Sequence, residues 1–350
     1  MNIPARRSAL PLPFALLCLL AHVFCALPTP AATLTPEKPA LTLAVGGKGL
    51  FYYLPLVVAE AKGYFREAGL DVDIVDFPGG AKSLQAVVGG SADVAAGSFE
   101  HVVNMRARGQ DLQAIALLAR YPAIVLALPP KEAESFKTAA SLRGRKVGIT
   151  APGSSTHLFL NNVLTRAGVP IAEVPVIGVG AGAGAVAAMR RGDIDALVHL
   201  DPVIRQLEAA GAAQVVIDTR TRAGAEAVYG GTYHAACLYA KRAFLTQHPR
   251  TAEALAGAQV RALQWLATAS TDDIIAVVPA AMRGSDVANY RAALENNRQI
   301  WSADGFLDTP GAEHVIAALA AFEPFVRDAH IEPAVLIDNR YGDAARSASP

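Results

Sequence analysis

Residues 80–93 read GAKSLQAVVGGSAD, and residues 182–195 read GAGAVAAMRRGDID. Both segments begin with Gly-Ala, continue through a helix-like apolar stretch, and end with Gly-x-x-Asp before a short apolar run. Upstream, residues 41–45 and 145–150 each lead into a glycine-containing loop and then another helix-like stretch. The sequence therefore predicts one strand–helix–strand–helix–strand pattern used twice. Two similar lobes enclose a cleft, and small ligands commonly bind in such clefts.

Strands alternate with helices in both predicted units. In the second unit, strands are expected at residues 146–150, 174–179, 196–200 and 213–218, with helices between them. Alternation of this kind is typical of parallel sheets that are covered by helices on both faces. The expected fold class is α/β, with two lobes that each contain a mostly parallel sheet flanked by helices.

The chain is expected to pass between the lobes twice. The predicted strand 235–239 has no partner in the second unit, and the chain is mostly helical after Pro249. We therefore expect lobe 1 to be discontinuous, with crossings near residues 125–130 and 230–236. Its two parts are residues 41–128 and 235–340, and residues 131–232 form lobe 2. The small, polar tail 342–350 is expected to be disordered.

The N-terminus has the order of a secretory signal. Two arginines, Arg6 and Arg7, precede an apolar stretch from residue 9 to 26, and small residues follow at Ala31 and Ala32. This order predicts a signal peptide over residues 1–31 and a periplasmic protein. The alternative is a single membrane anchor, which the short length and the prolines of the stretch disfavour.

Composition excludes several classes of protein. The chain has 350 residues, of which 52% are hydrophobic, enough for a substantial core. Its 31 basic and 31 acidic residues balance, so nothing indicates a nucleic-acid partner. Cys18 and Cys25 leave with the predicted signal peptide, and Cys237 alone cannot form an internal disulfide. We expect Cys237 to be a buried structural thiol.

The strongest candidate site follows the predicted strand 146–150. Ser154, Ser155 and Thr156 open a helix there, and hydroxyls beside free N–H groups at a helix N-terminus bind anions. The alternative interpretation is plain helix capping. Position at the carboxyl end of a strand favours a ligand role.

Equivalent loops of the two units supply further candidates. Ser98 and Phe99 follow the predicted strand 93–96, and Asp201 follows 196–200, so the repeat predicts that they face each other. The alternative for Ser98 and Asp201 is again a capped helix start. The first loop contains Gly47, which permits close backbone approach, and Phe51 and Tyr52, which can wall a pocket.

Motifs for other chemistries are missing from the sequence. It contains no H-E-x-x-H, no paired C-x-x-C, no G-x-S-x-G and no Walker loop, and its histidines do not cluster at metal spacing. We therefore predict no catalytic residue, no metal and no cofactor. Residues 180–185 fit G-x-G-x-x-A, but a flexible loop that enters a helix explains this single match better.

Residues 54–72 read LPLVVAEAKGYFREAGLDV, a run of the form P-L-x-x-A-x-x-x-G-Y-F-x-x-x-G-L-x-V. This run resembles a motif of the nitrate/sulfonate/taurine-type solute-binding proteins of ABC importers, a group that includes thiamine-precursor binders. Residues 89–94, 141–149 and 244–249 resemble three further family motifs, so the resemblance covers about residues 41–270.

The resemblance implies a type II periplasmic binding protein fold and delivery of the ligand to a permease in the inner membrane. It also implies ligand contacts at Gly47–Tyr52, Gly79, Gly80, Ser98, Ser154, Ser155 and Asp201. We expect a monomer without enzymatic activity. The cysteine-rich motif of the related pyrimidine synthases is absent.

The ligand class has two candidates. The first is a small organic anion such as a sulfonate, taurine or nitrate, although no decisive set of cations is visible beyond Lys48 and Arg120. The second is a heteroaromatic such as a thiamine-like pyrimidine, indicated by Phe51, Tyr52, Phe99, Tyr121 and Tyr233. The rivals from other classes are a pyrimidine synthase or dehydrogenase, and a receptor that signals rather than delivers.

Overall fold

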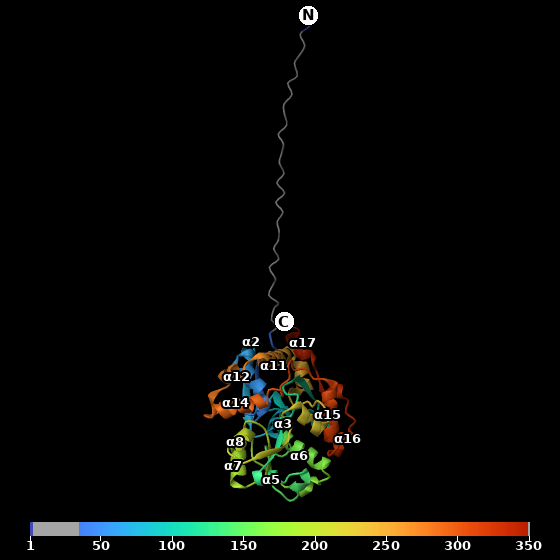
Figure 1. Cartoon of the computed structure of the whole chain (residues 1–350). Coiled ribbons are helices and arrows are strands. Elements are labelled where there is room, and N and C mark those ends of the chain that lie inside the picture. The colour runs from blue at the N-terminus through green and yellow to red at the C-terminus, as the bar shows by residue number, and fades with distance from the viewer. Residues whose placement is uncertain (3–34, 349–350) are drawn as a thin grey trace. The chain divides into compact units, whose positions relative to one another are not determined.

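The computed structural model describes residues 1, 2 and 35–348 of the chain. The predicted signal peptide, apart from its first two residues, lies outside this part, and so do the last two residues of the tail. The chain divides into a short N-terminal unit, Met1–Leu34, and a body, Thr35–Pro350. The helices and strands of the described residues belong to the body (Figure 1).

The first lobe contains a five-stranded sheet. The first part of the body forms β1 (Ala40–Gly46), the 3-10 helix η1 (Phe51–Tyr53), α1 (Leu54–Ala61), α2 (Tyr64–Glu67), β2 (Asp71–Phe77), α3 (Gly80–Gly89), β3 (Val94–Ser98), α4 (Phe99–Ala107) and β4 (Leu112–Leu117). The expected helix over residues 54–62 is confirmed by α1, and Gly63 terminates it at a positive φ of 75°.

The second lobe contains the other five-stranded sheet. Its elements are β5 (Val125–Leu128), α5 (Pro130–Ala133), η2 (Ala139–Leu142), β6 (Val147–Ile149), α6 (Ser155–Arg166), η3 (Ile171–Glu173), β7 (Val176–Gly178), α7 (Ala183–Arg191), β8 (Ala196–His199), α8 (Val203–Ala209), β9 (Gln214–Asp218) and α9 (Arg222–Tyr229).

The C-terminal part of the body is mostly helical, as its sequence predicts. It forms β10 (Ala236–Lys241), α10 (Arg242–Gln247), α11 (Pro249–Thr268), α12 (Thr271–Val277), α13 (Ala280–Arg283), α14 (Val287–Asn296), α15 (Thr309–Ala320), α16 (Pro324–Asp328), η4 (Pro333–Leu336) and α17 (Arg340–Ser347). Several of these helices pack on the first lobe, including α11 on α1 and α15 on α4.

The two sheets have the same strand order. The first is β2-β1-β3-β10-β4, and the second is β7-β6-β8-β5-β9. In each sheet the first three strands of the order pair in parallel. The fourth strand of each order is antiparallel to both neighbours. The predicted two-lobed α/β fold is therefore confirmed, with one antiparallel strand in each mostly parallel sheet.

The repeated Gly-x-x-Asp segments occupy equivalent places. Asp93 directly precedes β3, where its N–H donates to the Thr42 carbonyl at 2.9 Å and its Oδ2 accepts from the Thr42 N–H at 3.0 Å. Asp195 directly precedes β8, where its N–H donates to the Lys146 carbonyl at 2.8 Å and its Oδ2 accepts from the Lys146 N–H at 2.7 Å. The same side chain thus holds the neighbouring strand in both lobes, which explains why the motif occurs twice.

The first crossing between lobes comes earlier than predicted. We expected residues up to 128 in lobe 1, whereas β5 pairs with β8 and β9 in the second sheet. Both β4 and β5 are fully buried, so their apolar runs carry no signal of which sheet they join. On the return, β10 pairs with β3 and β4, as we expected for a strand at residues 235–239.

The C-terminal tail differs from its prediction. Residues 342–350 were expected to be disordered, but residues up to Ser347 continue the helix α17, which packs along α11. The small residues that suggested disorder allow close packing instead, because a Cβ at Gly257 of α11 would lie 3.6 Å from the Cβ of Ala345. Tyr341 also donates its hydroxyl to the Leu245 carbonyl at 3.2 Å.

Within the described part of the chain, no helix combines the length and the apolar character needed to cross a membrane.

Candidate functional site

Loops that follow the parallel strands of the two lobes contact each other. The Phe51 N–H, after β1, donates to the Asp201 carbonyl, after β8, at 3.1 Å. The Ala81 N–H, at the start of α3, donates to Ser154 Oγ, before α6, at 3.0 Å. The structure therefore brings together predicted residues of both lobes at the carboxyl ends of their strands.

Glycines lie at two close contacts between the lobes. A Cβ at Gly79 would lie 2.9 Å from the Cβ of Ala151 in the other lobe and 3.1 Å from Ser154 Oγ. Gly47 has a φ of 94°, and a Cβ there would lie 2.5 Å from the Cβ of Ala181. Both glycines, predicted as ligand contacts, allow this close approach of the two lobes.

At the predicted anion site, residues 154–156, the hydroxyls of Ser154 and Thr156 make hydrogen bonds to backbone groups of the protein itself. Ser154 takes the N-cap position of α6, but its side chain makes no capping bond and joins the lobes through Ala81 instead. Thr156 Oγ1 accepts from the Thr150 N–H at 3.0 Å, which holds the end of β6. Ser155 is half-buried at the first turn of the helix.

Ser98 begins a buried hydrogen-bonded cluster. Its Oγ accepts from the Glu100 N–H at 3.3 Å, so the capping alternative applies to it, and it donates to Glu100 Oε2 at 2.7 Å. The Tyr233 hydroxyl donates to Glu100 Oε1 at 2.6 Å. The Tyr233 ring stacks on Tyr229 of α9 with centroids 3.9 Å apart. The cluster therefore links α4 of the first lobe to the segment that returns from the second.

Burial changes the acid–base properties of Glu100 and His101. Glu100 is 3% exposed, and burial raises its pKa to about 7 against the opposing hydrogen bonds from Tyr233 and Ser98. His101 is 1% exposed, and burial lowers its pKa to about 4, which the nearby Gly153 backbone opposes. Neither Glu100 nor His101 is among the predicted site residues, because both also fit the first turn of a helix. Two ionisable residues directly after a buried strand were the available signal.

Asp201 is buried and hydrogen-bonded through both carboxylate oxygens. Oδ2 accepts from Arg220 Nη1 at 3.1 Å and from Asn297 Nδ2 at 2.7 Å. Oδ1 accepts from the Arg205 N–H at 3.0 Å, and Arg220 also pairs with Asp218 at 2.7 Å. Asp201 thus ties α8 to β9 and to the end of α14. Sequence reasoning missed Arg220 and Asn297, because neither lies near Asp201 along the chain.

The aromatic residues predicted to wall a pocket lie in the core beside the lobe contact. Each is at most 5% exposed: Phe51, Tyr52, Phe99, Tyr121 and Tyr233. The Phe51 ring meets Tyr290 edge-on, with centroids 4.9 Å apart. The Arg120 guanidinium lies 5.4 Å from the ring centroid of Tyr121.

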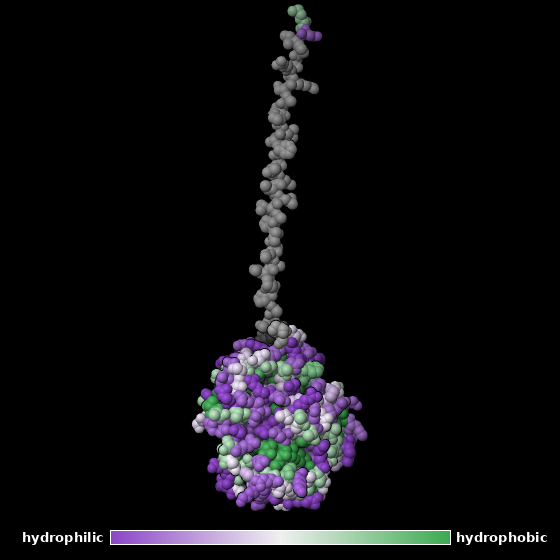
Figure 2. All heavy atoms as spheres, in the orientation of Figure 1, coloured by the Kyte–Doolittle hydropathy of each residue, from purple (hydrophilic) through white to green (hydrophobic). Residues whose placement is uncertain are grey.

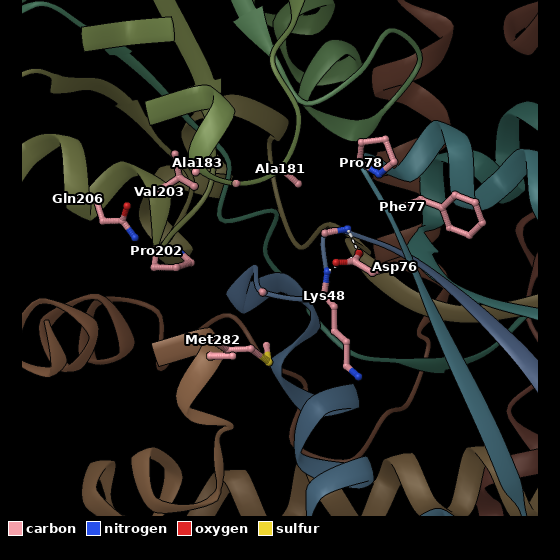
Figure 3. A pocket seen from close by; sticks show the side chains of 14 residues that line it. Lys48, Asp76, Phe77, Pro78, Ala181, Ala183, Pro202, Val203, Gln206 and Met282 are labelled. Carbon is pink, nitrogen blue, oxygen red and sulfur yellow. Dashed lines mark hydrogen bonds between the residues drawn. The ribbon is translucent and has the colours of Figure 1, made fainter. Parts of the chain in front are cut away.

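An open pocket of about 610 Å³ lies on one side of the lobe contact (Figure 3). Of the predicted residues, Gly47 lines it. Its N–H and that of Lys48 donate to Asp76 Oδ1 at 2.8 and 2.9 Å. The Lys48 ammonium pairs with Glu60 at 2.7 Å, so it is already engaged. Figure 3 shows Pro202 and Gln206 on the opposite side of the pocket.

A groove of about 590 Å³ lies between α3, α4 and α6. Figure 2 shows hydrophobic atoms gathered where Figure 1 labels α3 and α6, and Leu84 and Leu158 line the groove there. His101, Asn104 and Asn161 also line the groove. Each has one buried polar atom, His101 Nε2, Asn104 Oδ1 and Asn161 Oδ1, that no hydrogen-bond partner reaches from the described residues. Neither asparagine is among the predicted site residues.

Within the described residues, no group of three or more His, Cys, Asp or Glu side chains is placed to hold a metal ion. Cys237 is buried, as expected, and burial raises the pKa of its thiol.

Comparison with protein families gives one match. The family described as NMT1/THI5 like matches residues 51–270. Among curated proteins, a 4-amino-5-hydroxymethyl-2-methylpyrimidine phosphate synthase of Aspergillus parasiticus is 28% identical over 155 residues, which cover 43% of each chain. An Escherichia coli protein named for binding aliphatic sulfonates is 30% identical over 144 residues, 41% of this chain and 44% of the other. The matches to the first curated relatives cover 17% and 28% of those proteins.

Solved structures match over most of the chain. A Bordetella bronchiseptica RB50 protein is 46% identical, with a TM-score of 0.86, and the match covers 89% of this chain and 98% of that one. The alkanesulfonate-binding protein SsuA of Xanthomonas axonopodis pv. citri, bound to MOPS, is 20% identical with a TM-score of 0.66, covering 88% and 98%. The periplasmic nitrate-binding protein NrtA of Synechocystis PCC 6803 is 16% identical with a TM-score of 0.71, covering 90% of both chains. The last two similarities support the two-lobed fold alone.

Proposed function

Because this chain belongs to the NMT1/THI5-like family, we propose that it is the exported solute-binding protein of an ABC importer. The observation that carries the proposal is the contact between the strand-end loops of two like lobes, through Ala81–Ser154 and Phe51–Asp201. Hydrogen bonds between loops can break and re-form, so a hinge motion could open and close these contacts around a ligand. This geometry supports capture of a solute by closure of the lobes.

We propose that the protein acts in the periplasm as a monomer and delivers its solute to a permease in the inner membrane. The N-terminal order of basic, apolar and small residues supports export. The nitrate-binding protein NrtA, which has the same fold, is named as periplasmic. The family also matches pyrimidine phosphate synthases, but the missing cysteine-rich motif and the predicted export favour binding over catalysis.

The first candidate ligand is a small organic anion, such as a sulfonate, taurine or nitrate. Relatives named for binding alkanesulfonates and nitrate support this class. The N-terminus of α6 at Ser155 supports it too, because free N–H groups there favour an anion once the lobes open.

The second candidate is a heteroaromatic with N–H donors, such as a thiamine-like pyrimidine. The observation in its favour is the buried carboxyl group of Glu100, which accepts a hydrogen bond from the Tyr233 hydroxyl at 2.6 Å. A carboxyl oxygen can accept a hydrogen bond from a ring amine, and a buried carboxyl group with a raised pKa offers no positive charge to an anion.

Isothermal titration calorimetry tests the function and separates the ligand classes. The exported protein is titrated with taurine, an alkanesulfonate, nitrate and an aminopyrimidine. We expect saturable binding by one class, and Ser154→Ala weakens it by about ten-fold, near 1.4 kcal/mol, because closure loses the Ala81 bond. Ser141→Ala, on the exposed surface, is the matched control. Absence of binding across all four compounds contradicts a role as a solute carrier of these classes.

A further inference from the structure

A small pocket of about 250 Å³ lies between the two lobes, next to the 610 Å³ pocket, with which it shares Pro202 and Gln206. One side belongs to α8 of the second lobe and presents Arg205 and Gln206. The other side runs from the end of α13 into α14 and presents Arg283, Ser285 and Asn289. This side packs on the first lobe, since Tyr290 of α14 meets Phe51 edge-on and α12, which contacts α14, packs on α1.

The pocket contains two half-buried arginines, Arg205 and Arg283, that form no salt bridge within the described chain. The Nε atoms of Arg205 and Arg283 are both buried, and no hydrogen-bond partner reaches either from the described residues. Neither guanidinium forms an ion pair with a described acidic residue, whereas Arg220 nearby pairs with Asp201 and Asp218. Glu208 lies on the same helix as Arg205, but its salt bridge is to Arg220, at 3.9 Å.

This arrangement is costly without a partner. A buried donor without an acceptor loses its bonds to water, and two like charges on opposite walls repel each other. A guanidinium is built to bind carboxylate, sulfate and phosphate oxygens with two parallel N–H bonds. An oxyanion between the walls would satisfy both arginines at once.

We propose that this pocket binds a small oxyanion with two or more acceptor oxygens, held between Arg205 of one lobe and Arg283 of the other. The side chains of Gln206, Ser285 and Asn289 line the same space and offer further donors. Asp286 is the acidic residue of the lining, and its carboxylate accepts from the Asn289 N–H at 3.0 Å and Nδ2 at 2.6 Å. Its charge limits the affinity and favours a compact anion.

The position of the site gives it a consequence for lobe closure. Because the two arginines lie on different lobes, the anion contacts both only in the closed arrangement, so it stabilises that arrangement by linkage. The pocket is separate from the Ser98–Glu100 cluster and from Ser154. The inference therefore does not depend on which solute the cleft receives.

The test uses inorganic sulfate as the probe, with the full-length mature protein at constant ionic strength set with chloride. Calorimetric titration of the wild type should give saturable binding. Arg205→Gln and Arg283→Gln should each weaken binding about ten-fold or more, the size expected for loss of a charged hydrogen-bond partner. Arg190→Gln removes the same charge from the exposed surface of α7 and should leave the affinity unchanged.

A second variant keeps the test independent of folding defects. Arg283→Glu places a carboxylate opposite Arg205, so it should abolish sulfate binding while the lobes close without the anion, measured as a smaller radius of gyration by small-angle X-ray scattering. The proposal is overturned if sulfate gives no saturable heat with the wild type. It is equally overturned if both glutamine variants bind like Arg190→Gln.

Discussion

Glu100 and His101 are neighbours in sequence, and burial favours the neutral form of both. The folded pKa of Glu100, about 7, lies above its ordinary value of 4.5, so the folded protein keeps a proton that the unfolded chain releases. Its contribution to the free energy of unfolding therefore falls as pH rises from 4.5 to 7. The folded pKa of His101, about 4, lies below 6.5, so its contribution falls as pH drops from 6.5 to 4. Between pH 4.5 and 6.5 the two effects offset each other.

Substitution of either residue should expose the effect of the other. Relative to the wild type, Glu100→Gln should gain unfolding free energy between pH 4.5 and 7, by about 1.4 kcal/mol per pH unit. Relative to the wild type, the free energy of unfolding of His101→Gln should rise as the pH falls from 6.5 to 4. Urea unfolding at a series of pH values measures both, with the exposed Glu134→Gln as control. A constant difference between wild type and Glu100→Gln at all pH values would contradict the assigned pKa.

Single residues show what the sequence can and cannot predict about the site. Ser98, Ser154 and Asp201 could be singled out because each lies at the carboxyl end of a strand, or in the loop after it, within a recognisable repeat. Arg220 and Asn297 were not found, because their contact with Asp201 depends on how the second lobe and α14 come together. The pattern of a sequence gives positions along elements, while such partners depend on the packing between elements.

At the scale of elements, Asp93 before β3 and Asp195 before β8 each accept a hydrogen bond from a backbone N–H of the neighbouring strand. Asp195→Ala should remove the bond to the Lys146 N–H and lower the free energy of unfolding by about 1–2 kcal/mol. Asp193→Ala, two residues away, loses only an exposed pair with Arg191 and should cost less than about 0.5 kcal/mol. Urea denaturation of the two variants measures the difference. Equal losses would mean that the Asp195 bond adds nothing to the sheet.

The repeat in the sequence predicted where helices and strands lie along the chain better than it predicted which sheet or helix each of them packs against. Helices such as α3 and α7 were recognisable because apolar spacing and a following glycine, Gly90 or Gly192, mark their ends. The strand β5 was assigned to the wrong lobe, since a strand buried on both faces has no polar side to show which sheet it joins. The helix α17 was missed because a short, polar helix gains its stability from packing on α11 rather than from its own sequence.

At the scale of the whole molecule, the approach of the two lobes depends on small residues at their contact. Gly79→Val should hold the lobes apart, because a Cβ there would lie 2.9 Å from Ala151. Small-angle scattering should then give a larger radius of gyration, and affinity for the captured solute should fall by more than about ten-fold. Gly182, the equivalent N-cap in the second lobe, has open space around a Cβ, so Gly182→Val is the matched control. Similar scattering from both variants would show that Gly79 does not govern closure.

Because the first sheet includes a strand from the C-terminal part of the chain, its order of assembly during biosynthesis is constrained. The first sheet needs β10, which lies between β3 and β4 in space but follows the whole second lobe in sequence. A chain released only as far as residue 235 therefore holds every strand of the second sheet, while β3 and β4 still lack the neighbour that joins them. Unpaired strand edges attract other chains, so this stage is the one most exposed to aggregation. The lobe that emerges first is thus completed last.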